Sequence, residues 1–92
     1  MRTDIEAMTP NELVSWFLIG CYAYYELSEP VMTDTDFDFL VERLKEEWDN
    51  ADHYHKEIIN KGHLEATTGY DIDYPKIIKY ATKGYILRTS SQ

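Results

Sequence analysis

The segment between Thr9 and Pro30 constrains the fold of this chain most strongly. A helix start lies at 9–12, because Thr9 can accept a backbone hydrogen bond, Pro10 suits a first turn and Glu12 completes a capping box. Apolar residues then occupy almost every side of the helix: Leu13, Val14, Trp16, Phe17, Leu18, Ile19, Cys21, Tyr22, Tyr24, Tyr25 and Leu27. A helix that is apolar all round is buried in the middle of a fold. We therefore expect a central core helix that ends before Pro30.

A second helix is predicted directly after this turn. Thr33 is its expected N-cap, and Asp34 and Asp36 lie at the positive end of the helix dipole. Its apolar residues recur at helical spacing: Phe37, Leu40, Val41, Leu44 and Trp48. The opposite face is polar: Glu42, Arg43, Lys45, Glu46 and Asp49. This pattern predicts an amphipathic helix that packs on the first one, giving a helical hairpin over residues 10–50.

The rest of the chain is predicted as a helical extension over 51–87 and a loose tail over 88–92. Helical spacing continues weakly to Ile59, so one long helix and two helices with a break near Asn50 both fit. A last helix is expected to begin near Tyr74 and to stop at Gly84. Its predicted apolar stripe is Tyr74, Ile77, Ile78 and Ala81. The predicted fold class is all-α: a helical hairpin plus one or two further short helices in one domain, 1–92.

The charge of the chain is −8 and unevenly distributed. Between Glu26 and Asp52 there are ten acidic residues against two basic ones. Direct nucleic-acid binding needs a basic footprint and is therefore not expected. An acidic helical face instead fits a protein partner with a basic surface, or mimicry of nucleic-acid charge, while the alternative is a solvated face that maintains solubility.

Cysteine content and hydropathy indicate the compartment. Cys21 is the one cysteine, so an intrachain disulfide is excluded, which fits a reducing environment. The longest apolar-rich stretch, 13–27, is too short to span a bilayer, and the N-terminal residues do not form a secretory signal. We expect a cytoplasmic protein without membrane association. Burial of Cys21 in the apolar helix is expected to raise its pKa and to make it unreactive.

The turn between the two predicted helices joins an aromatic helix end to an acidic helix start. Such a hairpin forms a cleft with ring faces on one wall and carboxylates on the other. Flat aromatic or cationic rings that carry hydroxyls or amides suit such a cleft. The alternative is that the tyrosines belong to the core and the aspartates only charge a helix N-terminus.

This stretch resembles the small N-terminal helical subdomain of NAD-dependent bacterial DNA ligases, with the pattern Tyr-x-Tyr-(His/Tyr)-x-x-x-x-Pro-x-x-x-Asp-x-x-Tyr-Asp-x-Leu. The matching positions are Tyr22, Tyr24, Tyr25, Pro30, Asp34, Phe37, Asp38 and Leu40. The resemblance covers residues 10–50. In that family the subdomain closes over the nicotinamide mononucleotide (NMN) half of NAD. It therefore implies an NMN or NAD pocket formed by Tyr24, Tyr25, Asp34, Phe37 and Asp38.

The sequence also departs from the ligase pattern. Phe37 replaces a tyrosine and lacks its hydroxyl. No lysine lies in a Lys-x-Asp-Gly context and there is no Gly-rich phosphate loop, so we expect a stand-alone module without the ligase catalytic domain. We therefore expect no catalytic residues, no required cofactor and no enzymatic activity.

The histidines do not form a predicted metal site. On a helix His53 and His55 point in different directions, and the pair of His53 with Glu57 lacks further ligands. Two hypotheses for function remain. The first is a small, non-enzymatic interaction or regulatory module that binds a protein partner through its acidic face, for which a phage origin is open. The second is an accessory module related to NAD-dependent DNA ligase that binds NMN or NAD.

Overall fold

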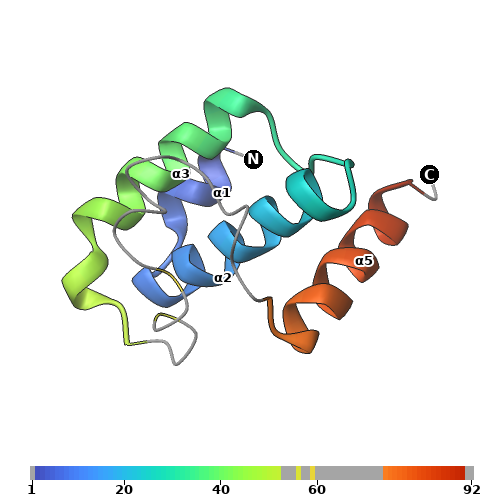
Figure 1. Cartoon of the computed structure of the whole chain (residues 1–92). Helices are drawn as coiled ribbons and strands as arrows, with labels where there is room; N and C mark the ends of the chain where they lie inside the picture. Colours follow the sequence, from blue (N-terminus) through green and yellow to red (C-terminus); the bar gives the residue numbers. More distant parts are fainter. Residues whose placement is uncertain (1, 53–55, 57–58, 60–73, 91–92) are drawn as a thin grey trace.

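The computed structural model of the chain describes residues 2–52, 56, 59 and 74–90, and within these ranges every regular element is a helix. The elements are α1 (Arg2–Ala7), α2 (Pro10–Cys21), η1 (Tyr22–Glu26), α3 (Asp34–Glu46), η2 (Trp48–Asn50) and α5 (Lys76–Ser90). Figure 1 shows α2 in the centre, with α1 and α3 on one side of it and α5 on the other. The prediction of an all-α fold is confirmed.

The start of α2 is the capping box that the sequence predicts. The backbone N–H of Glu12 donates to the Thr9 hydroxyl (3.2 Å), and the backbone N–H of Thr9 donates to Glu12 Oε1 (3.0 Å). These bonds satisfy two of the donors that a helix start leaves without partners. Apolar residues along α2 are buried: Leu13, Val14, Phe17, Leu18, Ile19 and Cys21. The prediction of a central core helix is therefore confirmed.

The end of this helix lies before Pro30, as predicted, and has a backbone geometry that the sequence does not indicate. From Tyr22 to Glu26 the backbone widens into a π-helix, so that Leu27 N–H donates to the carbonyl of Tyr22 (3.2 Å). Ser28 then adopts a φ of 55°, and this left-handed residue turns the chain out of the helix. The helix therefore ends at Glu26, before Pro30 as predicted, and Ser28 is the residue that turns the chain.

α3 completes the hairpin. The Thr33 hydroxyl accepts from the backbone N–H of Asp36 (3.1 Å), as expected of an N-cap. Leu40, Val41 and Leu44 are buried in the core between α2 and α1. The amphipathic helix predicted here is therefore present, and it ends at Glu46.

α1 has no counterpart among the sequence-based predictions. Ile5 is fully buried and Met8, directly after α1, is nearly so, and both belong to the core. The Arg43 side chain fixes α1 to α3, because its Nη1 donates to the carbonyls of Ile5 (2.9 Å) and Met8 (3.1 Å). Arg43 had been assigned to the solvated face of α3, and that assignment is wrong.

The C-terminal half follows the prediction only in part. α3 gives way to the 3₁₀ turn of η2 and then to extended backbone at Ala51, which excludes one long helix through Asn50; a second helix beyond this break would lie largely outside the described residues. The helix predicted to stop at Gly84 continues to Ser90, so both the stop and the loose tail from Arg88 onward are corrected. The weak helical spacing that continues to Ile59 falls largely outside the described residues. The Thr67-Thr68-Gly69 sequence predicts a loop over 63–72, and this whole range lies outside them.

The buried face of α5 also differs from the predicted stripe. Tyr74, Ile78 and Thr82 are buried, whereas Ile77 and Ala81 are exposed. The residues that face the core therefore follow a spacing of four. The buried Thr82 hydroxyl donates a hydrogen bond to the carbonyl of Ile78 (2.7 Å), so this polar group has a partner in the core.

Candidate functional site

A cavity of about 320 Å³ lies where the end of α2 and η1 meet the start of α3. All five residues predicted for the nucleotide pocket line it: Tyr24, Tyr25, Asp34, Phe37 and Asp38. The other lining residues are Gly20, Cys21, Pro30, Val31 and Met32. The hairpin therefore brings together every site residue that was proposed from the sequence.

The aromatic wall of this pocket comes from η1. Tyr24 and Tyr25 are adjacent in sequence, and their rings form an edge-to-face pair with centroids 4.9 Å apart and an interplanar angle of 81°. Tyr24 is 52% exposed, so its ring is accessible to a ligand. Both tyrosines lie within the π-helix, a geometry that recurs at functional sites.

The floor of the pocket is apolar. The Phe37 ring lies against Gly20, where an added Cβ would be only 3.1 Å from Phe37 Cε1. Phe37 also stacks on the buried ring of Phe17, three residues before Gly20 on α2, with centroids 5.7 Å apart and planes inclined by 21°. Gly20 weakens α2 intrinsically, and its role here is to admit the Phe37 ring.

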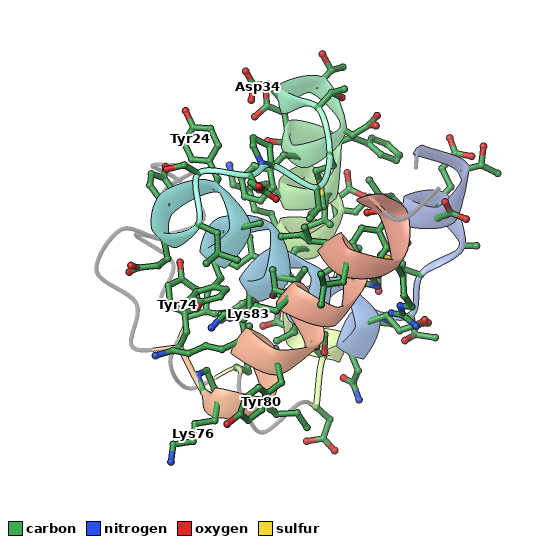
Figure 2. The ribbon with its side chains drawn as sticks, turned by 90° about the vertical axis from the view of Figure 1, so that its right-hand side faces the viewer. Tyr24, Asp34, Tyr74, Lys76, Tyr80 and Lys83 are labelled. Carbon is green, nitrogen blue, oxygen red and sulfur yellow. The ribbon has the colours of Figure 1, made fainter. Side chains whose placement is uncertain are left out.

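The opposite wall carries two carboxylates. Asp34 and Asp38 are exposed and lie one turn apart on α3, and Phe37 lies on the same helix face. Figure 2 shows Tyr24 and Asp34 at the same end of the molecule, Tyr24 from η1 and Asp34 from the first turn of α3. Asp34 also faces the positive end of the α3 dipole, which stabilises its charge. Among the described lining residues, these two carboxylates are the charged groups, so the pocket is acidic.

Cys21 lies at the inner side of the pocket and is fully buried. Burial raises the pKa of Cys21 to about 12, against which a hydrogen bond with Tyr74 acts weakly. Burial, reinforced by the nearby Cys21 and Glu26, also raises the pKa of Tyr74, whose ring packs on Tyr22 (5.3 Å between centroids). The thiol is therefore protonated at neutral pH and a poor nucleophile, as predicted.

Gly20, Cys21, Val31 and Met32 also line the pocket, although the sequence analysis did not assign them to it. Helical spacing is the signal that could have identified the first two. Gly20 lies four residues and Cys21 three residues before Tyr24, so all three share one face of the helix. No local pattern marks Val31 and Met32, which lie in the turn that the positive φ of Ser28 directs back over α2.

Other site types find no support in the described ranges. Within them no group of three or more His, Cys, Asp or Glu residues is placed to hold a metal ion. The histidines considered in the sequence, His53, His55 and His63, lie outside these ranges. None of the described helices has both the length and the apolarity needed to cross a membrane.

Comparison of the chain with protein-family models, with curated proteins and with solved structures gives no match.

Proposed function

We propose that this chain is a non-enzymatic accessory module that binds the nicotinamide end of NMN or NAD between η1 and α3. One observation carries the proposal: the five residues that the ligase resemblance assigns to the nicotinamide pocket line one cavity. These residues come from both sides of the turn, separated by up to fourteen positions in sequence, from Tyr24 to Asp38. We also propose that the chain is related to the N-terminal subdomain of NAD-dependent DNA ligases.

The chemistry of the pocket fits a nicotinamide nucleoside. Oxidised nicotinamide is a flat cation, which is attracted to the ring faces of Tyr24 and Tyr25 and to the carboxylates of Asp34 and Asp38. The same carboxylates can accept hydrogen bonds from ribose hydroxyls. A volume of about 320 Å³ lies at the lower end of the range of about 300–1,000 Å³ for small-molecule sites.

The same pocket is poorly suited to the phosphate of NMN. Its described lining carries negative charge and supplies no basic side chain against a phosphate. We therefore propose that the module recognises the nicotinamide riboside portion and leaves the phosphate in solvent or to another protein. The protonated Cys21 thiol and the lack of a Lys-x-Asp-Gly sequence support a binding role without catalysis.

The test compares NMN affinity between wild type and the Asp38→Asn variant, by calorimetry or tyrosine fluorescence. Asp38 is exposed, so the variant should fold as wild type does. The proposal predicts at least about a fivefold loss of affinity, from loss of charge attraction and a charge-assisted hydrogen bond. The matched control is Glu42→Gln, one turn further along α3 and outside the pocket, which should bind like wild type. Equal affinity of all three proteins would contradict the proposal.

A second candidate function is docking of a basic protein surface on the outer face of α3. The observation in its favour is the position of Arg43, which donates to two carbonyls near the end of α1 and is thereby removed from that face. Lys45 lies 3.4 Å from Glu42, so its charge is partly offset. The exposed residues left on this side are therefore dominated by Glu42, Glu46 and Asp49.

This second candidate predicts a partner that binds through charge. Reversal of Glu42, Glu46 and Glu47 to lysine should abolish its capture while the helical circular dichroism stays unchanged. The Tyr24→Ser variant serves as the control, because it alters the pocket and changes no residue of α3. Capture that survives the triple reversal would exclude this function.

A further inference from the structure

α5 has apolar side chains on two opposite faces. Its inner face contributes the buried Ile78 and the ring of Tyr85, which forms an edge-to-face contact with Trp16 (5.2 Å between centroids). Its outer face exposes three large apolar residues: Ile77 (59%), Tyr80 (71%) and Leu87 (68%). A helix that is apolar on both faces is typical of a position between two packing partners, and the described part of the chain supplies one of them.

The exposed residues form a narrow seam along α5. Ile77, Tyr80, Gly84 and Leu87 are spaced by three, four and three residues, which is the spacing of core positions in a coiled coil. A Cβ on Gly84 would meet nothing within 4 Å, so the backbone at the middle of the seam is open to close approach. We call these four residues the α5 seam. Its width is that of a helix–helix contact.

The α5 seam is flanked by positive charge. α5 contains Lys76, Lys79, Lys83 and Arg88 and no acidic residue, in a chain whose net charge is −8. Figure 2 views the molecule from the side on which α5 lies, and Lys76 and Tyr80 extend from the N-terminal part of α5 away from the other helices. An occupant of the seam therefore needs apolar residues at helical spacing and acidic residues beside them.

Copies of this chain fit these requirements poorly. Two α5 helices placed seam to seam would bring their lysines together, which costs free energy. The α3 helix of a second copy is acidic, but its exposed residues are polar and offer no apolar seam: Asp34, Thr35, Asp38, Glu42, Lys45 and Glu46. A membrane surface binds a broad apolar face, whereas the large exposed apolar side chains of α5 are confined to one narrow stripe of Ile77, Tyr80 and Leu87.

We propose that the α5 seam docks an amphipathic helix of another protein, whose apolar seam is flanked by glutamates or aspartates. This interface lies on α5, outside the residues that line the nicotinamide pocket, and it does not depend on the function proposed for that pocket. It would attach the module to a larger assembly by a face distinct from the acidic face of α3.

The test is an amide NMR titration of the isotope-labelled chain with a designed helical peptide of about three heptads. The peptide carries Leu at positions a and d and Glu at e and g, and a matched peptide carries Lys at e and g. We expect saturable shifts at Ile77, Tyr80, Gly84 and Leu87 with the glutamate peptide, and binding at least about tenfold weaker with the lysine peptide.

Two variants locate the contact. Leu87→Ser removes an exposed apolar side chain and should weaken binding of the glutamate peptide about tenfold. Lys83→Glu should also weaken binding of the glutamate peptide, and this effect should be larger at low salt, where charge repulsion is screened less. Tyr24→Ser is the matched control, because Tyr24 is also a large exposed apolar residue but lies outside α5, and its binding should equal that of wild type.

Several results would overturn the proposal. If the glutamate and lysine peptides bound with equal affinity, the partner would not be selected by its acidic residues. If Leu87→Ser bound the glutamate peptide as tightly as wild type does, the α5 seam would not be the contact surface. Shifts on α5 caused by phosphatidylserine vesicles or a DNA duplex, and not by the glutamate peptide, would assign the face to a different class of partner. Dimerisation in sedimentation experiments that Leu87→Ser abolishes would identify a second copy as the occupant.

Discussion

The ring of Phe37 rests on the backbone of Gly20, so closely that a methyl group at Gly20 would lie 3.1 and 3.2 Å from two of its carbon atoms. This contact joins α2 to α3 at the floor of the pocket. It explains why the central helix carries a glycine in its buried middle, where alanine would be intrinsically better by about 1 kcal/mol. The same ring stacks on Phe17, which limits how far it can move aside.

The first prediction concerns the coupling of these two residues. In the wild-type chain, Gly20→Ala raises the helix propensity of the residue, but its new methyl group lies too close to the Phe37 ring. In a Phe37→Leu background this close contact is relieved, so Gly20→Ala should be more favourable there by about 1 kcal/mol. A double-mutant cycle from urea unfolding measures this difference. An identical effect of Gly20→Ala in the two backgrounds would contradict the contact.

The second prediction concerns Arg43, whose guanidinium satisfies the carbonyls of Ile5 and Met8. Arg43→Met should lower the free energy of unfolding by about 1–3 kcal/mol, because it leaves these carbonyls without their charged donor. It should also increase amide hydrogen exchange in α1. Lys45→Met is the control, since Lys45 makes an exposed ion pair with Glu42, and it should change stability by less than about 0.5 kcal/mol. Equal effects of the two variants would refute this role.

The third prediction tests whether α5 continues through Gly84. The residue is helical, and an added Cβ would meet open space. Gly84→Ala should therefore stabilise the protein by about 0.5–1 kcal/mol, measured by urea or thermal unfolding. A helix that stopped there with Gly84 in a left-handed conformation would instead be destabilised by alanine. The sign of the change thus distinguishes the two descriptions.

The fourth prediction is a loss of stability at alkaline pH. Burial raises the pKa of Cys21 from 9.0 to about 12, so the folded chain retains a proton that the unfolded chain loses. The stability contributed by this group is complete below about pH 9 and decreases as the pH rises towards 12. The raised pKa of Tyr74 acts in the same direction at the upper end of this range.

Urea unfolding of wild type and Cys21→Ala at a series of pH values isolates the contribution of the thiol. The difference in free energy of unfolding between the two proteins should shrink above pH 9, because the variant has no thiol to ionise. A difference that stays constant across this range would show that Cys21 ionises equally easily in both states.

The sequence predicts the hairpin well because its signals are local. The capping box at Thr9 and Glu12, the Thr33 cap and the apolar spacing of α3 each act within one helical turn, and each is present in the structure. The cleft between the aromatic end of one helix and the acidic start of the next also follows from the local pattern, whereas the individual pocket residues are implied by the resemblance to the ligase subdomain.

The parts that were missed depend on contacts between distant segments. Arg43 looks solvated on a helical wheel, and only the position of α1 gives it two buried acceptors. α1 itself has few apolar residues and is held by its packing on α3. Gly84 resembles a helix stop, yet the packing of Ile78, Thr82 and Tyr85 carries α5 past it.

The measurement that most directly tests the central claim is an amide NMR titration of the labelled chain with NMN, followed by its reduced form. A lone module of this size should bind NMN with a dissociation constant on the order of 0.1–10 mM. We predict saturable shifts at Tyr24, Tyr25 and residues 34–38, and weaker binding of the reduced form, whose nicotinamide ring is uncharged. An absence of shifts at several millimolar NMN, or shifts confined to residues outside the pocket, would contradict the claim.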